Sequence, residues 1–129
     1  MYRKEIRVVD CTIRDGGLMN HWRFDDDFVK TIYKSCVEAG VDYMEFGYKS
    51  NDKYYSREEN GPWKFCDEAD LRRIVGDNKT RTKISAMIDI GRIDLESIKP
   101  KKESLIDMIR VACYIHQIDK AIQHAEYCL

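Results

Sequence analysis

The chain has 129 residues, of which 43% are hydrophobic and 35% charged, so it is long enough for one domain with a real core. Its formal net charge of −1, without a basic run, argues against nucleic acid or an anionic membrane as a partner. No segment has the length and apolarity of a membrane span, and the N-terminus lacks an apolar signal-peptide core. We therefore expect a cytoplasmic protein. The five cysteines, without a Cys-x-x-Cys pair, are expected to be reduced thiols.

The hydrophobic pattern predicts strands that alternate with helices along the whole chain. The predicted strands are 6–10, 41–47, 83–90 and 108–113. The predicted helices are 25–39, 67–75 and 116–129, with a further helical turn at 93–98. Gly40 is expected to end the first of them in a left-handed cap, and Gly76 stands just beyond the end of the second. The long segment 48–65 is polar, aromatic and irregular, which is typical of a functional loop.

Alternating units of this kind form a parallel sheet with helices outside it. A complete eight-unit barrel needs about 250 residues, so four units amount to roughly half of one. The sequence also stops inside a predicted helix, at Cys128-Leu129, without a capping glycine. We expect a single domain over residues 1–129 that is a fragment of a longer protein.

The segment Asp10–Gly17, which reads DCTIRDGG, lies at the end of the first predicted strand and the start of the following loop. Chemistry is usually placed at this end of a parallel sheet. Asp15 can bind a hard divalent cation, and Arg14 can donate hydrogen bonds to a developing oxyanion. The two glycines after Asp15 are expected to let the backbone turn sharply and a ligand come close.

This segment resembles the strand-1 signature of the DRE-TIM metallolyases, which is roughly Asp-x-Thr-x-Arg-Asp/Glu-Gly. The superfamily includes 3-hydroxy-3-methylglutaryl-CoA lyase, homocitrate and isopropylmalate synthases and 4-hydroxy-2-oxovalerate aldolase. A second segment, AGVDYMEFGY at 39–48, is similar to the family's second helix-to-strand junction, and the order and spacing of the two segments fit. The resemblance implies an α/β fold, the N-terminal (β/α)4 half of a TIM (β/α)8 barrel. It also implies a lyase that makes or breaks a carbon–carbon bond through an enolate.

By this resemblance, Arg14 is the catalytic cation that stabilises the enolate oxygen, Asp15 is a metal ligand, and Glu45 is a second catalytic residue close to metal and substrate. The alternative is that Arg14 and Asp15 form a strand-end ion pair and that Glu45 is a buried partner of Arg14. The implied metal is Mg²⁺ or Mn²⁺, acting as a Lewis acid on a small carbonyl or acid substrate. Thr12 and Asp10 are expected to share a strand face with Arg14, in supporting roles.

The sequence departs from the family at two points. Leu18 stands where the aldolase branch has a general-base histidine, and the His-x-His pair that completes the family's metal shell is absent. His21, His116 and His124 are too dispersed to nominate a metal cluster. Asp89 is expected either to line the mouth of the barrel or to cap the next helix.

These departures leave a second hypothesis open. The chain could be part of a non-catalytic, barrel-like module for binding or assembly, in which the DCTIRDGG segment has only a structural role. In either case we expect the chain to associate with copies of itself or with the remainder of a longer chain.

Overall fold

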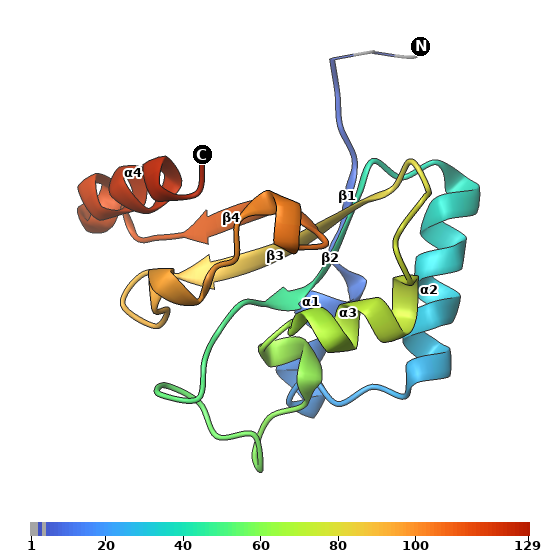
Figure 1. The fold of residues 1–129 in the computed structure, drawn as a ribbon, viewed down its shortest axis with the longest axis horizontal. Coiled ribbons are helices and arrows are strands. Elements are labelled where there is room, and N and C mark those ends of the chain that lie inside the picture. Colours follow the sequence, from blue (N-terminus) through green and yellow to red (C-terminus); the bar gives the residue numbers. More distant parts are fainter. Residues whose placement is uncertain (1–2, 4) are drawn as a thin grey trace.

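All four predicted strands lie in one parallel sheet. The structure, a computed structural model, describes residue 3 and residues 5–129, so Met1, Tyr2 and Lys4 of the N-terminal segment lie outside the described residues. The strands are β1 (Val9–Asp10), β2 (Tyr43–Tyr48), β3 (Lys83–Asp89) and β4 (Ile106–Ala112). They pair in the order β1-β2-β3-β4, and every neighbouring pair is parallel (Figure 1). The predicted α/β class and four-strand parallel arrangement are confirmed.

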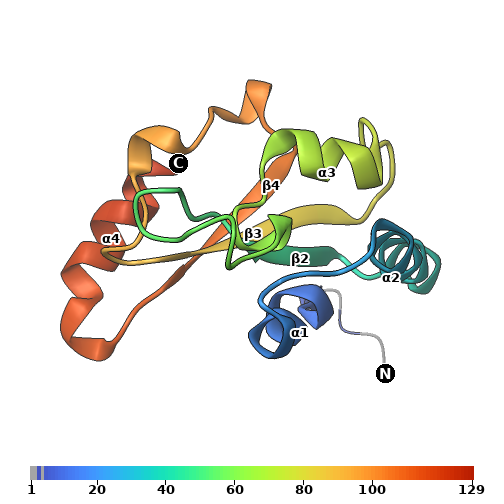
Figure 2. The ribbon, with the colours of Figure 1, turned by 90° about the horizontal axis from the view of Figure 1, so that it is seen from below.

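Helices follow three of the four strands. They are α1 (Thr12–Asn20), α2 (Asp26–Ala39), α3 (Glu68–Val75) and α4 (Ile118–Tyr127). The third unit has only 3₁₀ turns, at Leu95–Ser97 and Lys101–Glu103, and two more 3₁₀ turns lie at Pro62–Lys64 (η1) and Ile115–Gln117. Figure 2 shows α2 and α3 on the side of β2, while α4 lies at the other end of the sheet beside β4. None of the helices in the described part of the chain is long and apolar enough to cross a membrane.

The two helix ends with glycine form as predicted. Gly40 follows α2 with a φ of 71°, and its N–H donates to the carbonyls of Cys36 and Val37. Gly76 follows α3 with a φ of 60°, and its N–H donates to the carbonyl of Arg72. Gly40 has the left-handed helical conformation, whereas Gly76 combines its positive φ with a ψ of −131°. Both conformations let the N–H bind carbonyls at the end of the helix, and glycine adopts them without steric cost.

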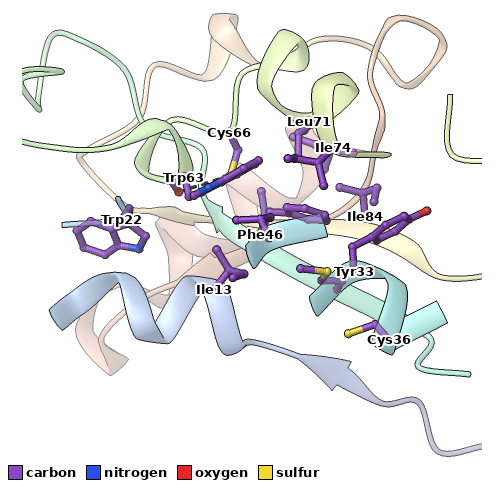
Figure 3. Packing of buried hydrophobic residues seen from close by; sticks show 14 residues of the cluster. Ile13, Trp22, Tyr33, Cys36, Phe46, Trp63, Cys66, Leu71, Ile74 and Ile84 are labelled. Carbon is purple, nitrogen blue, oxygen red and sulfur yellow. Dashed lines mark hydrogen bonds between the residues drawn. The ribbon is translucent and has the colours of Figure 1, made fainter. Parts of the chain in front are cut away.

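The hydrophobic core lies between β2 and the helices α1, α2 and α3. Phe46 of β2 is fully buried, and its ring centroid lies 5.4 Å from that of Trp63 and 6.2 Å from that of Tyr33. Figure 3 shows Phe46 at the centre of this cluster, with Leu71 and other side chains of α3 on one side and Ile13 of α1 on the other. The core therefore fixes α1 directly against the strand that carries Glu45.

The first strand is shorter than the predicted 6–10. The N–H of Val8 donates to Oδ2 of Asp42 at 2.9 Å. A side-chain carboxylate therefore accepts the hydrogen bond that a backbone carbonyl of a neighbouring strand would accept in a regular sheet. The N–H of Ile6 turns back to the carbonyl of Arg3. Ile6 and Val8 are both more than half exposed, so this segment lacks the burial that its apolar pattern suggested.

We expect the isolated 129-residue chain to self-associate in solution. β1 and β4 are the outer strands of an open sheet, and four strands do not close a barrel. On the last helical segment, Ile115 is 87% exposed and Ile118 and Ile122 about half exposed. Sedimentation velocity at micromolar concentration checks this. A compact monomer that unfolds cooperatively would show instead that the open sheet is self-sufficient.

Candidate active site

The DCTIRDGG segment is helical from Thr12 onward, which corrects the prediction that a loop follows the first strand. Helix α1 begins at Thr12, because Asp10 accepts hydrogen bonds from the N–H of Thr12 at 3.1 Å and from its hydroxyl at 2.9 Å. This local turn ends the strand, as Asx turns commonly do. Thr12 and Arg14 therefore do not continue a strand face with Asp10.

The two glycines also differ from the expectation, because both lie inside α1 rather than in a turn. A Cβ on Gly17 would lie 1.9 Å from Cδ1 of Trp22, so glycine is required there for the indole to pack against the helix. The indole Nε1 in turn donates to the carbonyl of Arg14 at 2.9 Å. Gly17 thus serves the packing of α1 rather than the approach of a ligand.

Glu45 is the centre of the site, and its side chain is fully buried. Oε1 accepts hydrogen bonds from Nε of Arg14 at 2.8 Å and from Nη2 of Arg110 at 3.0 Å. Oε2 accepts from Nε of Arg110 at 2.7 Å and from the hydroxyl of Ser85 at 3.3 Å. One buried carboxylate therefore binds two guanidinium groups, one from α1 and one from β4, and both of its oxygens are used.

A bulge in β2 decides which side chains share the face of Glu45. Glu45 pairs with Ser85 and Tyr48 pairs with Met87, while the register shifts at Phe46 between them. Ser85 and Met87 are two residues apart on β3, so they face the same side of the sheet, and so do their partners. Without the shift, the three-residue spacing of Glu45 and Tyr48 would place them on opposite faces. Tyr48 joins the site for this reason.

The charges around Arg14 keep it a cation. Burial disfavours its charged form, but the hydrogen bond to Glu45 and the charge of Asp15 raise the pKa of the guanidinium above its ordinary value. Asp15 Oδ1 lies 2.5 Å from Nη1 of Arg14, and its side chain is 57% exposed. Arg14 is thus oriented by one buried and one exposed carboxylate, both at the end of the sheet where β1 passes into α1.

Two neighbours of Arg14 have pKa values that are shifted by the same surroundings. Burial raises the pKa of the Tyr48 hydroxyl, Asp89 raises it further, and Arg14 opposes both. Burial and the charge of Glu45 raise the pKa of the Cys11 thiol, whose Sγ lies 3.6 Å from Oε1 of Glu45. Cys11 is therefore a neutral thiol beside the ion pair. All five cysteines are free, as expected.

Arg110 and Ser85 belong to the site but were not predicted from the sequence. Arg110 lies in β4 (Ile106–Ala112), and its hydrogen bond to Glu45 raises the pKa of its guanidinium. The sequence does carry a signal: an arginine in the middle of an apolar strand that is expected to be buried needs a carboxylate partner. Ser85 carries no comparable signal, because a small hydroxyl residue is common in strands.

The other candidate residues lie apart from this ion-pair cluster. Leu18 is one helical turn beyond Arg14 on α1 and is 63% exposed. His21 follows α1 with a left-handed backbone. Near the C-terminus, His116 is exposed and His124 is half-buried. Asp89 ends β3 and places negative charge near Tyr48. Of its two predicted roles, the structure therefore favours lining the mouth of the barrel over capping the next helix. Within residues 3 and 5–129, no group of three or more His, Cys, Asp or Glu side chains could hold a metal.

A hollow of about 390 Å³ opens at the carboxyl ends of β3 and β4. Asp89 lies in its wall, together with Arg92, Tyr114 and Gln117. A larger hollow of about 820 Å³ lies at the opposite ends of the strands, around Arg7 and Lys83. Chemistry in parallel α/β folds is placed at the carboxyl ends of the strands, so the hollow beside Asp89 is the better candidate for a substrate.

Comparison with known proteins finds similar sequences among aldolases. No protein-family model matches the chain. It is 27% identical over 124 residues to 4-hydroxy-2-oxovalerate aldolase of Geobacillus genomosp. 3, and 28% identical over 123 residues to the protein of the same name from Thermus thermophilus. The chain is thus similar in sequence to proteins named 4-hydroxy-2-oxovalerate aldolase. These matches cover 96% and 91% of this chain but 36% and 33% of the relatives, so it spans about a third of their length.

A solved structure gives the same result for the fold. The chain is similar, with a TM-score of 0.74 and 28% identity, to the crystal structure of the N-terminal domain of a protein assigned as an aldolase in Bacteroides vulgatus. The match covers 95% of this chain and 40% of that one. The predicted resemblance to aldolases is thereby confirmed, and the open four-stranded sheet is consistent with the N-terminal half of a TIM-type barrel.

Proposed function

We propose that the chain is the N-terminal part of a metal-dependent carbon–carbon lyase or aldolase that acts through an enolate on a small carbonyl acid. One observation carries the proposal. Arg14 is held by buried Glu45 and exposed Asp15 at the carboxyl end of a parallel sheet, in a relative of aldolases. Chemistry is placed at this end in barrels of this type.

In this proposal Arg14 is the catalytic cation that donates hydrogen bonds to the enolate oxygen as negative charge develops there. Glu45 is a positioning residue, because it is fully buried and both of its oxygens are bound by protein donors. Arg110 adds a second cation whose side chain is 37% exposed, which favours an anionic substrate. The sequence alone left two roles open for Glu45: a catalytic residue close to the metal and the substrate, or a buried ion-pair partner of Arg14. These contacts favour the role of ion-pair partner.

The residues of this chain fit a divalent metal only in part. Asp15 is suited to be a metal ligand because its side chain is exposed and only its Oδ1 is used in the contact with Arg14. Bound Mg²⁺ or Mn²⁺ would polarise the oxygens of the substrate as a Lewis acid. One carboxylate is not a competent site, so the remaining ligands would come from outside the 129 residues, and the chain alone would bind metal weakly.

A second candidate function is a non-catalytic module that binds a small acid or assists assembly. Leu18 favours it, because the position one turn after Arg14 carries an apolar side chain that cannot act as a base. In the enzyme hypothesis a base from another segment must move the proton.

Proton exchange distinguishes the two functions. We expect the full natural protein with Mn²⁺ to exchange the methyl protons of pyruvate for deuterium in D₂O, because enolate formation removes one of these protons. Proton NMR follows the loss of the methyl signal, and Arg14→Ala is the control that should abolish it. Saturable binding of pyruvate without exchange would favour the binding module and reject the lyase.

A further inference from the structure

Lys64 is a buried lysine whose ammonium group is surrounded by aromatic rings. Its Nζ lies 4.2 Å from the ring centroid of Trp22, 4.1 Å from that of Tyr48 and 4.0 Å from that of Tyr55. The residue is only 4% exposed. These three rings, which we call the Lys64 box, come from the end of α1, the end of β2 and the loop that follows β2. A single side chain therefore joins three segments at the carboxyl end of the sheet.

A buried charge without a carboxylate partner is costly, and lysine is rarely fully buried unless it is paired. Within the described residues Lys64 forms no ion pair closer than 4.0 Å, so the faces of the rings provide the attraction. Burial lowers the pKa of Lys64 to about 8, and the charge of Asp89 opposes this shift. The group is thus a cation at neutral pH. An apolar side chain would fill the box without this cost, which suggests that the charge serves the site.

Two members of the box contact Arg14. The indole Nε1 of Trp22 donates to the backbone carbonyl of Arg14 at 2.9 Å. The ring of Tyr48 lies edge-on to that of Trp22, with centroids 5.5 Å apart, and the nearby Arg14 guanidinium opposes the rise in the pKa of the Tyr48 hydroxyl. Lys64 therefore reaches both the backbone and the guanidinium of Arg14 through one intermediate ring each.

The backbone at Trp22 requires such support. Trp22 has a φ of 57°, which is uncommon for a residue with a large side chain. Its indole fits only because Gly17 has no Cβ, and its carbonyl lies 2.2 Å from where a Cβ of Gly61 would stand. Strained conformations persist where the surroundings determine them, and they cluster at functional sites.

We propose that Lys64 is a positioning residue for Arg14, whose ammonium draws Trp22 and Tyr48 together so that they hold Arg14 at the mouth of the barrel. The consequence for turnover rests on the proposed lyase function, but the link to Arg14 does not. Lys64 is not the amine that attacks a substrate carbonyl, because the three rings enclose its Nζ.

Nitrogen-15 NMR of the folded protein tests the link directly. The indole Nε1–H of Trp22 and the Nε–H of Arg14 each give a resonance, which Trp22→Phe and Arg14→Lys assign. We expect Lys64→Met, which keeps the length but removes the charge, to shift both resonances. Lys64→Arg, which keeps a cation over the rings, should restore them toward their original positions. The matched control is Lys53→Met, because Lys53 lies over the ring of Tyr54 at 5.5 Å in the same loop but is exposed.

Turnover of the full natural protein gives the second measurement. We expect Lys64→Met to lower kcat by about 10- to 100-fold with little change in KM, since small misplacements of a catalytic group have effects of this size. Trp22→Phe removes the hydrogen bond to Arg14 and should lower kcat similarly, so it replaces Lys64→Met if that variant does not fold. Unshifted Trp22 and Arg14 resonances in folded Lys64→Met would overturn the proposal, as would equal losses in Lys64→Met and Lys64→Arg. If the unmodified protein has no lyase activity, the proposed function fails while the resonances still decide the role of Lys64.

Discussion

Replacing Glu45 with glutamine should destabilise the fold by about 3 kcal/mol, although the side chain keeps its shape. Removing one partner of a buried ion pair costs about 3–5 kcal/mol, because the other charge stays uncompensated. Here two guanidiniums lose their common carboxylate, and the amide of glutamine would turn a donor toward Arg14 or Arg110. We expect the lower end of the range because their side chains are 15% and 37% exposed, so water compensates in part. Urea unfolding followed by circular dichroism measures the change.

Two further variants isolate the charge effect. Ser85→Ala removes the neutral donor to the same carboxylate and should cost only about 1 kcal/mol. Glu45→Gln combined with Arg110→Met removes one negative and one positive charge, so it should be more stable than Glu45→Gln alone. If Glu45→Gln is as stable as the unmodified protein, the two guanidiniums are solvated in solution and the buried cluster is not what holds the sheet to α1.

The parts of the fold that local rules determine were predictable from the sequence. Helices α2 and α3 end just before Gly40 and Gly76, as predicted, because a glycine that follows a helical pattern is a local signal for the end of a helix. The first strand was predicted too long because the bond from Val8 to the side chain of Asp42 joins residues that are 34 positions apart. Helix α1 was missed because a Gly-Gly pair usually marks a turn. The reason for Gly17 lies in Trp22, whose packing no local pattern reveals.

The candidate site likewise has some residues that the sequence predicted and others that depend on the tertiary structure. Arg14, Asp15 and Glu45 were named through the resemblance of two short motifs, and the structure brings all three together. Arg110 is 65 residues from Glu45, and its approach depends on strand order and register. The position of Tyr48 depends on a bulge, and the Lys64 box depends on three segments meeting in space. Periodicity within one sequence does not encode these features, although a lone arginine in an apolar strand could have been flagged.

Arg14→Lys should lower the turnover of the full natural protein by about 10²–10³-fold with a much smaller effect on substrate binding. Loss of one donor to a developing oxyanion typically has this cost. Arg14 binds Glu45 through Nε and Asp15 through Nη1, which leaves further N–H groups to donate to the proposed enolate oxygen. A lysine ammonium is a single point and cannot make the same set of contacts. Steady-state kinetics separates the two effects, because a change confined to the transition state lowers kcat and leaves KM nearly constant.

The matched control is Arg72→Lys on α3, which alters an exposed arginine paired with Asp77 and should leave turnover unchanged. Far-UV circular dichroism must first show that the Arg14 variant is folded, since Arg14 also neutralises Glu45. Near-normal turnover in a folded Arg14→Lys protein would remove Arg14 from the chemistry. The ion pair between Arg14 and Glu45 would then be purely architectural, as the hypothesis of a binding or assembly module requires.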